Sequence, residues 1–285
     1  MTNQFTRQRY PSDITDAQWE LLAPYIPEPG SYSPRLPISR REIVNGILYV
    51  LRTGCSWRQM PHDLPNGKTV YHYFRLWKLD GTWEKAMTSL RKRLRTHLGR
   101  EEEPSAAIID SQSIKTSPVR GNERGFDAGK KIYGRKRHLL VDTLGLLLAV
   151  KVHSAGLVDR RGAPLLLQDL AGRFPRLRHL FADSGYTGPL LAWIKTHLGW
   201  NTEIVPKPEQ WVLINGELAR LPGPQGGFQV QRQRWKVERT FGWLIRYRRL
   251  ARDYEGLPSS SEAFIQIASL RLFLTRLAPF RSFTP

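Results

Sequence analysis

The first hundred residues carry apolar side chains at helical intervals. Thr15 followed by Gln18 has the spacing of a capping box at a helix start, and Ser39 followed by Glu42 repeats it. Each pair precedes a stripe of apolar residues, and the second stripe stops at Gly54, a residue type that favours helix ends. The pattern predicts that two helices begin at these positions.

Two further amphipathic segments, residues 68–81 and 82–97, continue the helical pattern. The first carries Val70, Tyr71 and Phe74 on its apolar side and basic residues elsewhere. Several short helices around a basic, aromatic one would suit a helix–turn–helix element that docks in a DNA groove. Basic helix faces are more often simply solvated, so packing without DNA contact is the alternative.

An acidic stretch with Gly and Pro, residues 99–104, marks a linker. Short apolar runs alternate with helical patterns beyond it, and the expected strands are 106–109, 138–141, 146–152, 179–182 and 201–207. This order predicts an α/β domain with a mixed five-stranded sheet flanked by helices. We therefore expect a helical domain over residues 1–104 and an α/β domain over residues 105–285.

Asp110 and Asp183 each end one of these apolar runs, and a serine follows both. Sites in open α/β sheets lie at the carboxyl ends of strands, so two aspartates at strand ends are expected to meet. Like carboxylates at close range repel one another unless a cation or a proton lies between them. The pair predicts a divalent metal site, and the alternative for each residue alone is a helix cap or a turn.

Two other aspartates compete with this pair. Asp142 lies in an Asp-Thr-Leu-Gly stretch that joins two apolar runs as a β-hairpin, and turn chemistry accounts for it. Asp159 precedes a predicted helix, whose N-terminus it is expected to cap.

A third carboxylate is expected on a basic helix near the C-terminus. Residues 232–252 contain eight basic residues and one acid, Glu238. Taken as one helix, the segment puts Trp235 and Phe241 on the same side as Glu238, so that the acid points toward the sheet. An ion pair with Arg234, one turn earlier, is the alternative. Two aspartates and a glutamate form an all-oxygen set that suits Mg²⁺.

The overall charge favours a polyanionic partner. Forty-four Lys and Arg against 25 Asp and Glu give the 285-residue chain a net charge of +19, so nucleic acid is the leading candidate and solubility alone the alternative. The single cysteine, Cys55, excludes an internal disulfide. Because the chain lacks a signal-peptide pattern and a run of about 18 apolar residues, we expect a cytoplasmic, nucleoid-associated protein without a membrane partner.

Seven segments, in order, resemble the DDE transposases of bacterial insertion sequences, and the resemblance covers almost the entire chain. It implies a ribonuclease-H-like catalytic domain preceded by an all-α N-terminal domain. The N-terminal segments are "DAQWELLAPYIP", "ILYVLRTGCSWRQMPHDLP" and "VYHYFRLWKLDGTWEKA". The catalytic segments are "IIDSQSIKT", "GRKRHLLVDTLGLLLAV", "FADSGYTG" and "VERTFGWLIRYRRLARDYE".

The resemblance implies a catalytic, metal-binding triad in which Asp110 is the first aspartate, Asp183 the second and Glu238 the glutamate. Water activated by metal would cut DNA at the end of the mobile element, and the freed 3′-hydroxyl would then attack target DNA at the same metals. Two Mg²⁺ ions are expected, with Mn²⁺ as a substitute. The expected partners are the terminal inverted repeats of the element, target DNA and further copies of the chain, as a homodimer or higher oligomer. A nuclease of the same fold without strand transfer, and a DNA-binding regulator, are the alternatives.

Basic residues near the triad are expected to contact DNA phosphates. Arg234 fits the family signature Tyr-x2-Arg-x3-Glu-x6-Lys, whereas Gln231 replaces its tyrosine and Arg246 falls one position beyond its lysine. The expected contacts are Arg234, Arg239, Arg246, Arg248, Arg249, Lys131, Lys136 and Arg137. The last three belong to residues 130–138, for which a solvated loop is the alternative. A small insert is expected over residues 206–230, where Trp211 would either stack on a base or pack against its neighbours.

Overall fold

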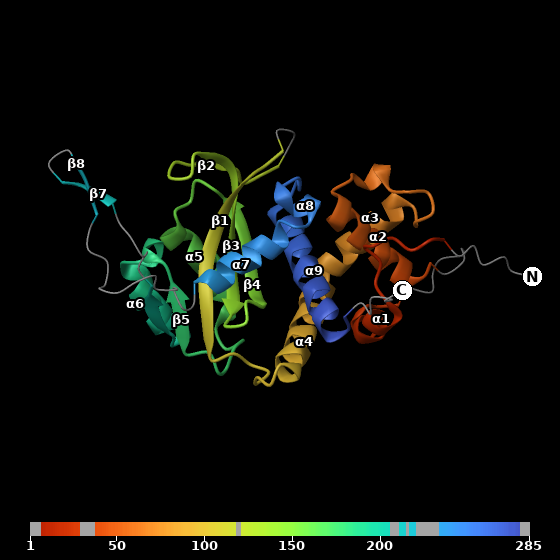
Figure 1. The fold of residues 1–285 in the computed structure, drawn as a ribbon, viewed down its shortest axis with the longest axis horizontal. Helices are drawn as coiled ribbons and strands as arrows, with labels where there is room; N and C mark the ends of the chain where they lie inside the picture. Colours follow the sequence, from red (N-terminus) through yellow and green to blue (C-terminus); the bar gives the residue numbers. More distant parts are fainter. Residues whose placement is uncertain are drawn as a thin grey trace, which may run out of the picture. The chain divides into compact units, whose positions relative to one another are not determined.

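The structure is a computed structural model that describes residues 7–28, 38–117, 121–205 and 234–279, and the backbone of 211–214 and 217–220. The chain forms two compact units (Figure 1). The sheet unit comprises Glu103–Ser113 and Arg124–Gly242, and the helical unit comprises Met1–Glu102, Ile114–Glu123 and Trp243–Pro285. The C-terminal segment thus groups with the N-terminal helices. The assignment of DNA binding to residues 1–104 and of catalysis to residues 105–285 stays a prediction.

The helical unit contains the helices that the N-terminal pattern predicts and two from the C-terminal segment. They are α1 (Asp16–Leu22), α2 (Arg40–Thr53), α3 (Gly67–Leu79), α4 (Thr82–His97), α8 (Arg248–Ala251) and α9 (Pro258–Leu277). Its core includes Ile47, Leu51, Trp77, Phe264 and Leu270, all buried. None of the helices in the described ranges is both long and apolar enough to cross a membrane.

One of the two expected capping boxes is present. Thr15 Oγ1 accepts a hydrogen bond from the Gln18 amide at 3.2 Å, and the Gln18 side chain accepts one from the Thr15 amide. The capping box expected at Ser39 is wrong, although α2 starts there. The Glu42 carboxylate accepts hydrogen bonds from the side chains of Arg7 and Asn45 instead, so it does not turn back to the helix end.

The sheet unit is built on a six-stranded mixed sheet. Its strands are β1 (Ala106–Lys115), β2 (Gly125–Asp127), β3 (Ile132–Asp142), β4 (Leu147–Ser154), β5 (His179–Ala182) and β6 (Asn201–Ile204). Neighbours follow the order β2-β3-β1-β5-β6, and β4 also pairs with β3. β1 with β5 and β5 with β6 are parallel, whereas β3 with β4 is antiparallel. All five expected strands are present, and the short strand β2 adds a sixth.

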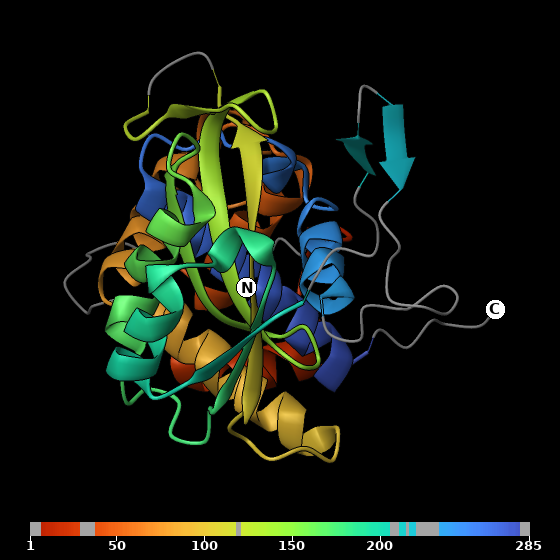
Figure 2. The same cartoon turned by 90° about the vertical axis from the view of Figure 1, so that its left-hand side faces the viewer.

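Helices cover this sheet on both faces. Helices α5 (Asp159–Leu167) and α6 (Pro189–Leu198) lie on one face, and α7 (Trp235–Leu244) lies on the other (Figure 2). The core under α5 and α6 includes Leu140, Leu166, Leu180 and Ile194. The insert expected over residues 206–230 contains an antiparallel pair, β7 (Trp211–Ile214) and β8 (Glu217–Arg220). The stacking role of Trp211 concerns a side chain outside the described part of the chain.

Three expected boundaries are wrong. Strand β1 does not end at Asp110 but continues to Lys115, because every second side chain after the aspartate, at Ser111 and Ser113, remains buried. The strand expected from residue 138 begins at Ile132, where β3 pairs first with β2 and then, from Arg135 onward, with β4. The single helix expected over residues 232–252 is interrupted, because Tyr247 takes an extended conformation between α7 and α8.

Candidate active site

The sheet sets Asp110 and Asp183 at the same level on neighbouring strands. In the parallel pairing of β1 with β5, Ala106 is opposite His179 and Ile108 is opposite Phe181. Continuing this register along both strands brings Asp110 level with Asp183, the residue directly after β5. The expected meeting of the two aspartates thus follows from strand register, although only one of them ends a strand.

Both carboxylates are held by backbone amides. Asp183 accepts a hydrogen bond from the Gly185 amide at 2.8 Å, and Asp110 accepts one from the Ser111 amide at 2.7 Å. The pKa of Asp110 is raised to about 6, first by burial and then by the charge of Asp183, although the Ser111 amide and the charges of Arg234 and Lys130 act in the opposite direction. The charged form of Asp110 is therefore disfavoured, which is the electrostatic condition that a bound cation relieves.

A further carboxylate, Asp159, lies beside this pair. Its Oδ1 accepts a hydrogen bond from Ser111 Oγ at 2.7 Å and pairs with Lys136 Nζ at 2.8 Å. A Cβ placed on Gly185 would lie 2.9 Å from Asp183 Oδ1 and 3.4 Å from Asp159 Oδ2, so this glycine separates the two acids. Burial alone would raise the pKa of Asp159, but the bonds from Lys136 and Ser111 bring it below its usual value.

The helix cap expected of Asp159 is wrong. The residue at the N-cap of α5 is Val158, and Asp159 is the first helical residue, with its side chain turned toward Ser111. The sequence pattern of Asp159 does not identify it as a neighbour of the site. The only signal was the serine next to Asp110, which needs a hydrogen-bond acceptor once its strand is buried. Asp142, in contrast, is the turn residue expected, since its Oδ1 accepts from the amides of Leu144 and Leu146.

Neutral aromatic side chains line the buried side of the site. Tyr186 is buried, and burial followed by the charges of Asp110, Asp159 and Asp183 raises the pKa of its hydroxyl well above the usual value. His138 lies edge-on to Tyr186 with ring centroids 5.8 Å apart, and its Nδ1 is 2.7 Å from Nε2 of His153. Burial and the neighbouring His153 lower the pKa of His138, so it remains neutral near pH 7.

Glu238 was expected on the buried side of its helix, but its side chain is exposed. The buried stripe of α7 consists of Val237, Phe241 and Leu244, and the Glu238 side chain beside it is 54% exposed. It forms the ion pair that was the alternative, with Arg234 Nη2 at 3.0 Å. The charge of Arg234 also lowers the pKa of Asp110, so this arginine interacts with both acids.

The three acids of the expected triad are therefore not gathered into one cluster. Across the described ranges, no group of three or more His, Cys, Asp and Glu side chains is arranged to hold a metal ion. Asp110 and Asp183 alone fit a hard divalent cation, because both offer oxygen ligands from one edge of the sheet and their charges repel.

Of the basic residues expected to contact DNA, some are buried or paired within the protein and others are exposed. Lys136 and Arg137 are buried in β3, and Lys136 is ion-paired with Asp159, so burial removes the basis for the DNA contacts expected of them. Arg249 pairs with Glu255 at 2.7 Å. The half-buried Arg239 donates a hydrogen bond to the Leu144 carbonyl at 2.9 Å. The side chains that the structure leaves exposed are those of Lys131, Arg246 and Arg248.

Level carboxylates at the edge of a mixed sheet are typical of enzymes that bind a divalent cation for phosphoryl transfer. Comparison with known families agrees. Residues 101–273 match the family model "Transposase DDE domain", and residues 14–87 match "Putative transposase of IS4/5 family".

Curated relatives also come from insertion sequences. The "Insertion element IS402 uncharacterized 16.2 kDa protein" of Burkholderia cepacia is 35% identical over 108 residues, covering 36% of this chain and 72% of the relative. The "Putative transposase for insertion sequence element IS6501" of Brucella ovis is 28% identical over 140 residues, covering 49% of this chain and 97% of the relative. A solved piggyBac transposase synaptic complex with hairpin DNA aligns over 92% of this chain and 71% of that one, at 10% identity and a TM-score of 0.47.

Because the DDE-domain model matches more than half of the chain, the chain belongs to the DDE transposases of bacterial insertion sequences. It is a DNA transposase, and its mixed sheet flanked by helices is the ribonuclease-H-like fold of the DDE domain. Members of this family bind DNA and use a divalent metal ion.

Proposed function

We propose that the chain cuts DNA at the terminal inverted repeats of its element and joins the freed 3′-hydroxyl ends to target DNA, with Asp110, Asp183 and Glu238 as catalytic residues. The observation that carries this proposal is the shared level of Asp110 and Asp183 on adjacent parallel strands. Two carboxylates held this way, one of them with a raised pKa, are poised to receive a cation.

Asp110 and Asp183 would hold Mg²⁺, and the all-oxygen ligand set also accommodates Mn²⁺. When bound, a pair of such ions supplies activation of the attacking oxygen and stabilisation of the leaving oxygen in an in-line displacement. The backbone amides of Ser111 and Gly185 orient the two carboxylates. Tyr186 and His138, which both remain neutral, add no charge of their own beside them.

Glu238 would join the aspartates by leaving Arg234. This arginine is nearly buried, pairs with Glu238 and acts on the charge of Asp110. A DNA phosphate at the site would compete for its guanidinium, because arginine binds phosphate and carboxylate through the same fork of donors. Arg234 would then hold the phosphate, and Glu238 would be free to turn toward the aspartates. The exposed Lys131, Arg246 and Arg248 are candidates for further phosphate contacts.

The pairing of two element ends requires at least two active sites, so we also propose that the protein works on DNA as a homodimer or a higher oligomer. Sedimentation of the complex with terminal-repeat DNA tests this part. One protomer on each unpaired DNA end, at every protein concentration, would contradict it.

The catalytic proposal is tested by incubating the protein with Mg²⁺ and DNA carrying the repeats that flank its gene, and by mapping every product end. The expected products are element ends with free 3′-hydroxyls and joined strands, absent in the Asp183→Asn variant. Cleavage without joined products would favour a nuclease. Binding without cleavage in either protein would favour a DNA-binding regulator.

A further inference from the structure

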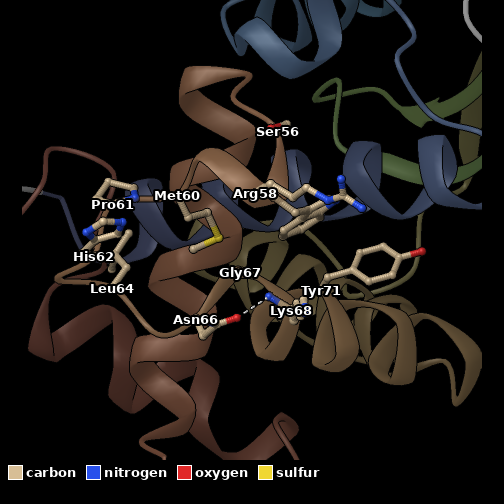
Figure 3. Close-up of a pocket in the computed structure, with 11 residues that line it drawn as sticks. Ser56, Arg58, Met60, Pro61, His62, Leu64, Asn66, Gly67, Lys68 and Tyr71 are labelled. Atoms are coloured by element: carbon tan, nitrogen blue, oxygen red, sulfur yellow. Dashed lines mark hydrogen bonds between the residues drawn. The ribbon is translucent and has the colours of Figure 1, made fainter.

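A pocket of about 740 Å³ opens in the helical unit, and none of the acids of the candidate site belongs to its lining (Figure 3). It lies between the short 3-10 helix Trp57–Gln59, the loop that follows, and the first turns of α3. This volume is in the range of pockets that hold small organic ligands. The pocket is therefore large enough for one nucleotide.

One wall of this pocket is a supported aromatic surface. The Trp57 ring lies 5.5 Å from the Tyr71 ring, and behind it lie Phe74 at 5.3 Å and Phe264 at 6.0 Å, between centroids. Both phenylalanines are buried, so they fix the position of Trp57. Tyr71, in contrast, is 45% exposed. The wall thus combines a fixed ring with an accessible one, which is the property of a stacking platform.

The backbone around Gly67 keeps this wall close to α3. A Cβ on Gly67 would lie 1.8 Å from the Trp57 carbonyl oxygen, so only glycine allows α3 to start against the 3-10 helix. The aromatic wall is therefore a consequence of the local sequence.

The pocket lining carries basic side chains and no acidic ones. Arg58, Lys68 and His62 are exposed members of its lining, which contains neither Asp nor Glu. Around Arg58 and Lys68, no carboxylate of the described ranges lies within ion-pair distance. In Figure 3 Arg58 and Tyr71 lie on one side of the pocket, and Lys68 lies near Asn66 and Gly67. An apolar aromatic wall beside exposed cations is complementary to a flat ring that carries a phosphate.

We propose that this pocket binds one unpaired nucleotide of the DNA substrate, with its base against Trp57 and Tyr71 and its phosphate at Arg58 and Lys68. The inference rests on the proposed function, since it takes DNA as the substrate. A base within a duplex is covered by its stacked neighbours, so only an unpaired base presents its face to an aromatic wall. Strand cutting and joining are reactions in which unpaired nucleotides arise. The pocket would hold one of them outside the catalytic centre.

The test compares binding of three short DNA duplexes by fluorescence anisotropy, with a chelator present so that no strand is cut. One duplex is fully paired, one contains a single unpaired thymidine, and one has an abasic site in place of that thymidine. We expect the unpaired thymidine to lower the dissociation constant about tenfold relative to both other duplexes. The abasic duplex separates base stacking from simple bending at the unpaired site.

Tyr71→Ala is expected to abolish this preference, and Arg58→Ala to weaken it. Lys85→Ala, which removes an exposed charge from α4 of the same unit, serves as the matched control and should keep the preference. Unchanged thermal unfolding of each variant excludes a folding defect. Equal affinity for the three duplexes in the wild type, or a preference that survives Tyr71→Ala, would overturn the inference. Cleavage that depends on Asp110 in a protein without this preference would contradict the inference and leave the proposed function intact.

Discussion

The aspartates and the glutamate of the candidate site are held by different kinds of structure. Asp110 and Asp183 stand on hydrogen-bonded neighbouring strands, where register fixes their relative level. Glu238 stands on helix α7, with more than half of its side chain exposed and its carboxylate paired with Arg234. Strand register determines which side chains meet, whereas the direction of a helical side chain depends on the rotation of the helix and on the partner it finds.

In the proposed catalytic centre two of the three acids are thus preorganised, whereas the third would join only when the centre is assembled. The pKa of Asp110 is raised first by burial and then by the charge of Asp183. The charge of Glu238, in contrast, is balanced by Arg234. Four predictions would break or sharpen this contrast.

The largest effect is expected from removing either aspartate charge. Asp110→Asn or Asp183→Asn should lower DNA cleavage at least about 10³-fold, about 4 kcal/mol in the barrier, because an amide supplies no negative charge to the cation. Mapping of product ends with Mg²⁺ measures the loss, and a mobility-shift assay should show unchanged DNA binding. Cleavage within a few-fold of wild type in both variants would remove these residues from the centre.

A smaller loss, about 10²-fold in cleavage, is expected for Glu238→Gln, because the glutamate joins a site that is already formed by the aspartates. The free energy of unfolding should change by less than about 0.5 kcal/mol, since the ion pair with Arg234 is largely exposed. Urea unfolding and the cleavage assay give the two numbers. Full cleavage by this variant would leave Glu238 as a surface ion-pair partner only.

Asp159→Asn should act mainly on stability. The substitution removes the carboxylate that pairs with the buried Lys136 and should cost about 2–3 kcal/mol in the free energy of unfolding. DNA cleavage should fall only about tenfold. Lys136 also lies 3.6 Å from Asp127, which limits the loss. The double variant Asp159→Asn/Lys136→Met is the control. If unpaired charge is the cause, urea unfolding should show that the double variant is more stable than the single one.

The smallest effect concerns pH in the absence of metal. The pKa of Asp110 is about 6 in the folded protein, above its usual 3.8, so its ionisation destabilises the fold as the pH rises through this interval. Asp110→Asn should therefore be more stable than wild type by about 1–2 kcal/mol at pH 8 and equally stable at pH 4. Urea unfolding at both values, with chelator, measures this. An identical difference at both pH values would contradict the assignment.

Much of the sheet unit follows from the sequence. The apolar run before Asp183 and the turn after it identify a buried strand with a carboxylate at its end, and the Asp142 turn identifies the hairpin. These features are local, because period-2 burial and turn chemistry are determined within a few residues. The meeting of Asp110 with Asp183 was expected from two strand ends. Since β1 continues to Lys115, the two residues are level because of the register of β1 with β5.

The remaining features depend on contacts between distant segments. Lys136 and Arg137 resemble loop residues in the sequence, and only the presence of Asp159 and Asp127 nearby explains how Lys136 is buried in a strand. The role of Asp159 depends in the same way on Ser111 and Gly185. The direction of Glu238 could not be predicted from its spacing, because the apolar stripe of α7 passes through Val237 and Phe241, next to the acid.

The most direct test of the central claim, that the two aspartates hold the metal in the free protein and Glu238 joins only with DNA, is a Mn²⁺ titration followed by electron paramagnetic resonance. Without DNA, wild type and Glu238→Gln should bind Mn²⁺ with similar affinity, whereas Asp110→Asn and Asp183→Asn should lose binding. With terminal-repeat DNA, wild type should bind more tightly than Glu238→Gln. Loss of Mn²⁺ binding in DNA-free Glu238→Gln, or its retention in both aspartate variants, would contradict the account.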